Sequence, residues 1–227
     1  SRVVNMQFLF GYYKDFDQDI SRWDTSRVRT MKSMFKHAYK FSHGLGQWDT
    51  AKSTNMDYTF DHAYAFNQKL VWDTSQVTSM VNTFYNAQAF NSELAWDTSS
   101  VTAMSFTFVW ANAFNSELNW DTSSVTGFEY MFNRASRFNG DLSRWDMSKA
   151  VNLNEMFQGV SGYARSDVLN WDVAAVTDFT DMFEGTLLAE DACFQHLTGQ
   201  HFGATFAIHE FPVVVYPFGE KYQAWHD

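Results

Sequence analysis

Residues 90–111 have the sequence FNSELAWDTSSVTAMSFTFVWA, and residues 114–135 repeat its pattern as FNSELNWDTSSVTGFEYMFNRA. The Trp-Asp pair in these stretches recurs every 24 to 26 residues along the chain, at Trp23, Trp48, Trp72, Trp96, Trp120, Trp145 and Trp171. A near-constant period of this length is typical of a solenoid, in which neighbouring units stack and share one core.

Apolar residues keep their register within each unit. We number positions from the Trp of a unit, so that position 12 is the twelfth residue after it. Position 12 is always Phe, at Phe35, Phe60, Phe84, Phe108, Phe132, Phe157 and Phe183. Position 8 holds Met, Leu or Phe, and position 18 is aromatic in six units. These positions are the predicted core.

The spacing of apolar residues within a unit predicts an α-helix. Val77, Met80, Phe84 and Ala87 fall at i, i+3, i+7 and i+10, which is one face of a helix of about three turns. Asp73, directly after its Trp, offers a side-chain oxygen at the expected helix N-terminus. Helix capping therefore accounts for the recurring Asp without a row of Ca²⁺ ions, each of which needs six to eight oxygen ligands.

Residues 94–96, Leu-Ala-Trp, predict a short strand with alternating faces. The sequence thus predicts an α/β repeat solenoid: a leucine-rich-repeat-like, right-handed coil of short parallel strands and helices, with about eight coils. Strands stack about 4.8 Å apart and helices about 8–10 Å apart, so the coil should curve. We expect the solenoid to cover residues 1–186, with its first unit truncated, because Met6 and Phe10 match a unit whose Trp would precede residue 1.

Residues 187–227 do not repeat, and we expect them to form a C-terminal cap. Their most strand-like segment lies between Pro212 and Pro217 and consists of Val213, Val214, Val215 and Tyr216. The alternative is an assembly segment, in which this strand pairs with the edge of another chain. Capping is favoured because every solenoid has an end to cover.

Composition excludes several classes of function. The net charge of −10 argues against nucleic acid as a partner. Cys193 is the single cysteine, so no disulfide forms within the chain. No apolar run is long enough to span a membrane. The seven His residues show no zinc-like spacing, although Cys193, His196 and His201 lie close together in sequence. We therefore predict no metal, no cofactor and no catalytic residues.

Large aromatic residues recur where the predicted helices face away from the core. On a helix, position 10 points about 200° from position 8. Across four adjacent units this outer side carries Tyr58, Tyr85, Phe106, Trp110 and Tyr130. We expect these five to form a contiguous partner-binding patch. The alternatives are that a loop covers them or that packing between helices absorbs them.

The recurring pattern F-N-x-x-L-x-W-D-T-S-x-V-T-x-M-x-x-M-F-x-x-A resembles the repeat of BspA-like bacterial surface proteins, a domain of unknown function related to leucine-rich repeats. The resemblance covers residues 1 to about 186, and residues 90–111 and 114–135 carry it most clearly. It implies extracellular or cell-surface display, adhesion and protein contact, and it transfers no catalytic residue.

These observations predict a non-enzymatic surface or extracellular protein. Its rigid repeat scaffold would mediate protein–protein contact, adhesion to a surface ligand or structural assembly, including self-assembly with other protein subunits. The alternative is a carbohydrate-binding module, because rows of aromatic rings stack on sugar rings.

Overall fold

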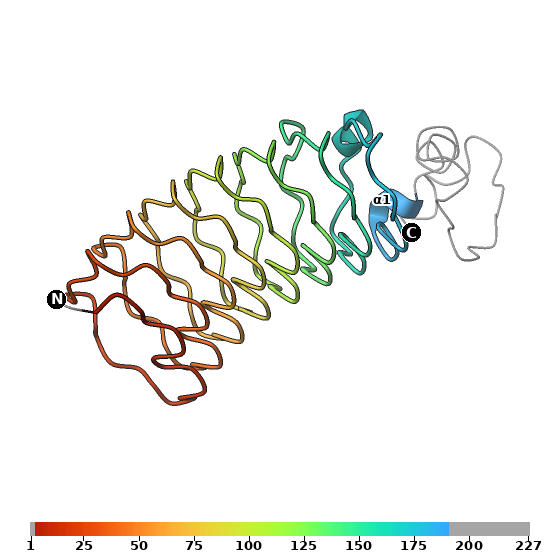
Figure 1. Ribbon diagram of the computed structural model, residues 1–227. Coiled ribbons are helices and arrows are strands. Elements are labelled where there is room, and N and C mark those ends of the chain that lie inside the picture. The colour runs from red at the N-terminus through yellow and green to blue at the C-terminus, as the bar shows by residue number, and fades with distance from the viewer. Residues whose placement is uncertain (1–2, 191–227) are drawn as a thin grey trace, which may run out of the picture.

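The computed structural model of the chain describes residues 3–190, which wind into a stack of coils with one coil for each sequence unit (Figure 1). We name each coil after its Trp. Parallel β-bridges join position 7 of each coil to position 7 of the next, through Asn5, Thr30, Asn55, Ser79, Ala103, Gly127, Asn152 and Asp178. Consecutive coils are therefore direct hydrogen-bonding neighbours along the whole stack.

Backbone hydrogen bonds between coils recur at alternate residues from position 8 to position 14. In the Trp72 coil these N–H groups donate to carbonyl oxygens of the Trp96 coil: Met80 to Ala103 (3.0 Å), Asn82 to Ser105 (3.1 Å), Phe84 to Thr107 (2.9 Å) and Asn86 to Val109 (2.6 Å). Positions 11 and 13 bond within their own coil, as the Thr83 N–H does to the Met80 oxygen at 3.2 Å. Each segment thus alternates between stacking bonds and tight turns.

The α-helices predicted at positions 5–15 do not form, and this part of the prediction is wrong. An α-helix directs every N–H to the carbonyl four residues earlier, whereas every second N–H here reaches the next coil. The misleading signal was the spacing of Met80 and Phe84. Two successive four-residue turns place positions 8 and 12 on one side, and an apolar repeat of four residues mimics a helix.

No strand is assigned at residues 94–96 or elsewhere in residues 3–190, where pairing is limited to the single bridges at position 7. Backbone hydrogen bonds join neighbouring coils at position 6 as well as at positions 8–14. The predicted curvature depended on helices needing wider spacing than strands, so this reason for curvature is removed. Membership of the leucine-rich-repeat class and the right hand of the coil stay predictions.

The two turns require left-handed backbone at positions 10 and 14. In the Trp171 coil, Met182 and Thr186 N–H groups close turns with Phe179 and Phe183 oxygens, and φ is +52° at Asp181 and +71° at Gly185. A positive φ at the third residue of a four-residue turn is the pattern of a type II turn, which favours Gly or Asn there. The same two positions have positive φ in every Trp coil.

Replacing Gly185 with Ala should destabilise the protein by about 1 kcal/mol, because a Cβ is disfavoured at positive φ. The new Cβ would meet nothing closer than 3.5 Å, so backbone strain is isolated from steric clash. Gly44→Ala is the matched control: its Cβ has no atom within 4 Å and its φ is not positive. The control should stabilise by about 0.4–1 kcal/mol. Denaturant unfolding measures both, and an unchanged or raised stability in Gly185→Ala would contradict the turn assignment.

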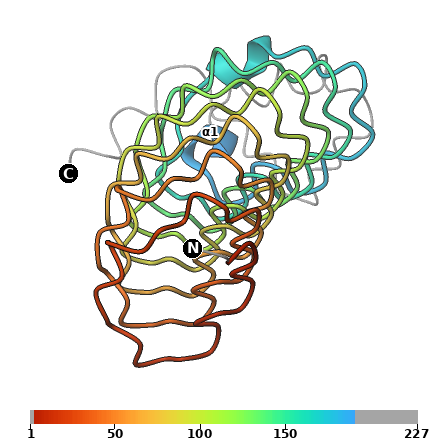
Figure 2. The same cartoon turned by 60° about the vertical axis from the view of Figure 1, so that its left-hand side comes forward.

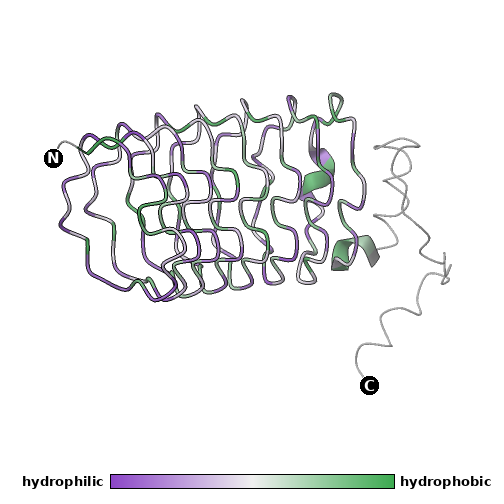
Figure 3. Ribbon diagram, turned by 60° about the horizontal axis from the view of Figure 1, so that its bottom comes forward, coloured by the Kyte–Doolittle hydropathy of each residue, from purple (hydrophilic) through white to green (hydrophobic). Residues whose placement is uncertain are grey.

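The coils wind around a common interior (Figure 2). Ladders of aromatic side chains fill it. Successive position-12 rings stack along the ladder with centroids 5.4–5.6 Å apart, from Phe35 to Phe183. The Trp side chains form a parallel ladder, with Trp72 and Trp96 at 6.2 Å and an interplanar angle of 1°. Hydrophobic and hydrophilic stretches consequently alternate in register from coil to coil (Figure 3). The predicted core positions lie buried as the repeat indicated.

The buried Trp and Thr side chains of the Trp-Asp-Thr motif join neighbouring coils by hydrogen bonds. The Trp96 indole Nε1 donates to the carbonyl of Leu70, two residues before Trp72, at 3.3 Å. The buried Thr98 hydroxyl donates to the Asp121 carbonyl of the following coil at 2.9 Å. Asp97 does not cap a helix. Its Oδ1 accepts hydrogen bonds from the Ser99 hydroxyl, at 2.7 Å, and from the Ser99 backbone N–H, and these bonds close a local turn. The Ser99 hydroxyl lowers the pKa of the Asp97 carboxyl.

The two helices of the described residues lie near the C-terminal end of the stack. The 3₁₀ helix η1 spans Asp167–Asn170 and the α-helix α1 spans Leu187–Glu190 (Figure 1). The Thr186 hydroxyl accepts from the Ala189 N–H at 3.0 Å, as an N-cap residue does.

Among residues 3–190 there is no helix with the length and apolar character that crossing a membrane requires. The predicted cap beyond residue 190 and the Val213–Tyr216 segment lie outside the described residues.

One core position departs from the apolar pattern. Position 18 is Phe in five coils but Tyr163 in the Trp145 coil, where the side chain is completely buried. Within residues 3–190 its hydroxyl has no hydrogen-bond partner. Burial raises the pKa of the Tyr163 hydroxyl well above its ordinary value, so the group stays neutral.

Tyr163→Phe should therefore stabilise the protein by about 1 kcal/mol, because it removes an unsatisfied buried hydroxyl. For a chain of this size the thermal midpoint should rise by about 2–4 °C. Phe138→Tyr, at the same position one coil earlier, is the matched control and should lower the midpoint. A lower midpoint for Tyr163→Phe would show that the hydroxyl has a partner.

Candidate functional site

The left-handed positions carry side chains that vary between coils. Position 10 holds Ser33, Tyr58, Asn82, Phe106, Tyr130, Glu155 and Asp181, and position 14 holds His37, His62, Asn86, Trp110, Arg134, Gly159 and Gly185. Only Asn82, Asn86, Gly159 and Gly185 are of the residue types that a type II turn favours. Bulky residues elsewhere cost about 1–3 kcal/mol each in backbone strain. Stability of the turn therefore does not explain the aromatic residues.

Phe106 and Tyr130 form one pair on this surface. Their rings stack with centroids 4.7 Å apart and an angle of 7°. Both side chains are half-buried. The Tyr130 hydroxyl donates to Glu155 Oε1 at 2.7 Å, and this bond to a carboxylate raises the pKa of Tyr130 to about 12. Position 10 thus forms a continuous column over three coils.

Trp110 is the most exposed of the five predicted residues, with 39% of its surface accessible. The guanidinium of Arg134, at the same position of the next coil, lies 4.8 Å from the centre of the Trp110 ring. Both side chains border an open hollow of about 590 Å³, lined also by Gln88, Asn112, Ala113, Ser136, Arg137 and Gly159. An indole face, two guanidinium groups and amide side chains thus surround one concave surface.

The other two predicted residues lie apart from this group. Tyr58 is covered by the Lys36 ammonium, 4.4 Å from its ring centre. Tyr85 stacks on His62 at 5.4 Å. Asn82, 8% exposed, occupies position 10 between Tyr58 and Phe106. Among the five predicted residues, all of them described, a ring-to-ring contact joins Phe106 and Tyr130 alone. That all five residues form one contiguous patch stays a prediction.

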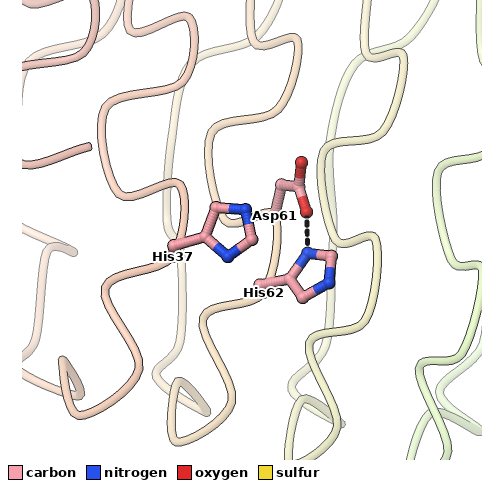
Figure 4. A group of neighbouring side chains, drawn as sticks. All are labelled: His37, Asp61 and His62. Carbon is pink, nitrogen blue, oxygen red and sulfur yellow. Dashed lines mark hydrogen bonds and ion pairs between the residues drawn. The ribbon is translucent and has the colours of Figure 1, made fainter. Parts of the chain in front are cut away.

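A second cluster, whose His residues show no zinc-like spacing in the sequence, lies across the Trp23 and Trp48 coils (Figure 4). The imidazoles of His37 and His62 stack with centroids 4.3 Å apart. Buried Asp61 binds the His62 Nδ1 through Oδ1 and the Lys36 ammonium through Oδ2, at 2.6 Å for Lys36. Burial lowers the pKa of His37, and the neighbouring His62 lowers it further. The shared repeat position of the two His residues was the signal in the sequence.

The stacked coils and the varied outer positions define a repeat protein with a uniform interior. The chain belongs to the family described as Mycoplasma protein of unknown function, DUF285, whose profile matches residues 1–95 and again residues 94–194. The two tandem matches cover the described stack. No curated protein and no solved structure matches the chain significantly.

Proposed function

We propose that this protein is a non-enzymatic binding scaffold that contacts another protein through the surface formed by Trp110, Arg134, Phe106 and Tyr130. We include in the proposal the finer assignment to BspA-like surface repeats and, with it, an extracellular or cell-surface location. The recurring Phe-Asn and Trp-Asp-Thr-Ser motifs support that assignment.

The observation that carries the proposal is the contrast between inner and outer positions. Position 12 is Phe in all seven Trp coils, whereas positions 10 and 14 change in almost every coil. The outer positions also accept large rings where the backbone favours Gly or Asn. A frame that repeats itself while its outer side chains vary presents a specific surface at fixed spacing.

The chemistry of the surface favours a protein partner. Trp, Tyr and Arg are the residues most enriched among those that dominate protein–protein binding energy. Trp110 and Arg134 are already held against each other in the free protein, so little side-chain freedom is lost on binding. Because the hollow is open rather than enclosed, it suits a protruding side chain or loop of a partner.

The test is binding of the full chain to itself, by sedimentation equilibrium, and to arrays of extracellular proteins and of glycans. We expect micromolar or tighter binding to a protein, which Trp110→Ala weakens by at least about tenfold, the effect of one binding hot spot. Val71→Ser is the control, because Val71 is 66% exposed but does not line the hollow. Its binding should match the wild type.

The carbohydrate-binding alternative is favoured by the partly exposed indole of Trp110. It predicts a different outcome of the same experiment: glycan binding that Trp110→Ala abolishes, with no protein bound. A wild type that binds neither itself, nor any protein, nor any glycan would reject both functions for this surface.

A further inference from the structure

We propose that His37, His62 and Asp61 bind one divalent transition-metal ion of the zinc class on the outer surface of the Trp23 and Trp48 coils. One ligand atom from each side chain lies within 4.8 Å of the other two. This site is separate from the hollow beside Trp110 and does not depend on the binding function proposed above.

The backbone holds the three side chains in place. The His37 N–H donates to the Asp61 carbonyl oxygen at 2.7 Å, and the His62 N–H donates to the Tyr85 oxygen at 2.7 Å. Both His residues have left-handed backbone, with φ of 59° and 58°, so their side chains leave the stack in the same direction (Figure 4). Adjacent coils thus bring together residues 25 positions apart without any local sequence motif.

Neighbouring rings restrict where the two imidazoles can move. Tyr12 stacks on the outer side of His37 at 4.9 Å, and Tyr85 stacks on His62 at 5.4 Å. The four rings form one ladder with the His pair in its middle. The backbone and the neighbouring rings therefore keep the two imidazoles close together before any ion arrives.

The donor set selects the kind of metal. Two imidazole nitrogens and one carboxylate are the protein ligands of zinc sites that keep a fourth position for water. Ni²⁺, Cu²⁺ and Zn²⁺ bind such nitrogen donors best among the divalent first-row ions. Ca²⁺ requires six to eight oxygen ligands, and this cluster offers a single carboxylate.

Metal binding requires two rearrangements. The imidazoles are stacked at an interplanar angle of 29°, so one must turn for both in-plane lone pairs to meet one ion. The ion must also replace the Lys36 ammonium at Asp61 Oδ2. Lys36 retains a second partner after displacement, because its ammonium already lies 4.4 Å from the Tyr58 ring. Lys36 is thus a built-in competitor of the metal.

Calorimetric titration of the full chain with ZnCl₂ tests the site. His37→Asn and His62→Asn should each abolish binding of one equivalent of zinc or lower the affinity for zinc by at least about tenfold. His43→Asn is the matched control, because this half-exposed imidazole pairs with Asp17 instead. The control should bind as the wild type does, and circular dichroism in metal-free buffer should show that all variants are folded.

Lys36→Met provides a second, opposite test. Removing the competing ammonium should tighten zinc binding several-fold, an effect that general destabilisation does not produce. The proposal is overturned if the wild type binds no zinc, or if the zinc it binds is unaffected by both His37→Asn and His62→Asn. Unchanged or weakened binding in Lys36→Met would overturn the role of Asp61 as a ligand.

Discussion

The structure depends on one backbone segment of each coil, positions 8–14, in which every second N–H group bonds to the next coil. Between positions 10 and 14, each stacking hydrogen bond alternates with a turn bond inside the coil, as at Phe84 and Thr83. This alternation fixes the four-residue period of the turns and forces a left-handed backbone at positions 10 and 14. The same constraint therefore determines which residues enter the core and which project outward.

The sequence predicted the repeat and its interior well, because core burial leaves a direct trace in the apolar positions. Phe84 and Trp96 lie in continuous ring ladders, as their fixed spacing indicated. The local conformation was not predictable in the same way. Met80 and Phe84 stand four residues apart in a helix turn and in two successive β-turns alike. Hydrogen bonding to residues more than 20 positions away, which distinguishes the two, leaves no periodic signal of its own.

The surface was predicted only in part for the same reason. Trp110, Phe106 and Tyr130 were identified as outward-facing, but the helical assumption did not show that Trp110 meets Arg134 or that Asn82 separates Tyr58 from Phe106. Such neighbours are set by coil stacking. These residues stand at positions where the left-handed backbone disfavours bulky side chains. Their presence there is therefore explained by function rather than by folding.

The most direct test of this account is the through-hydrogen-bond NMR coupling of the Phe84 amide nitrogen in the isotope-labelled protein. The account predicts a coupling to the carbonyl carbon of Thr107, in the next coil, whose oxygen lies 2.9 Å from that nitrogen. A coupling to the carbonyl carbon of Met80, four residues earlier, would instead show an α-helix. That result would contradict the stacked-turn structure and, with it, the outward placement of positions 10 and 14.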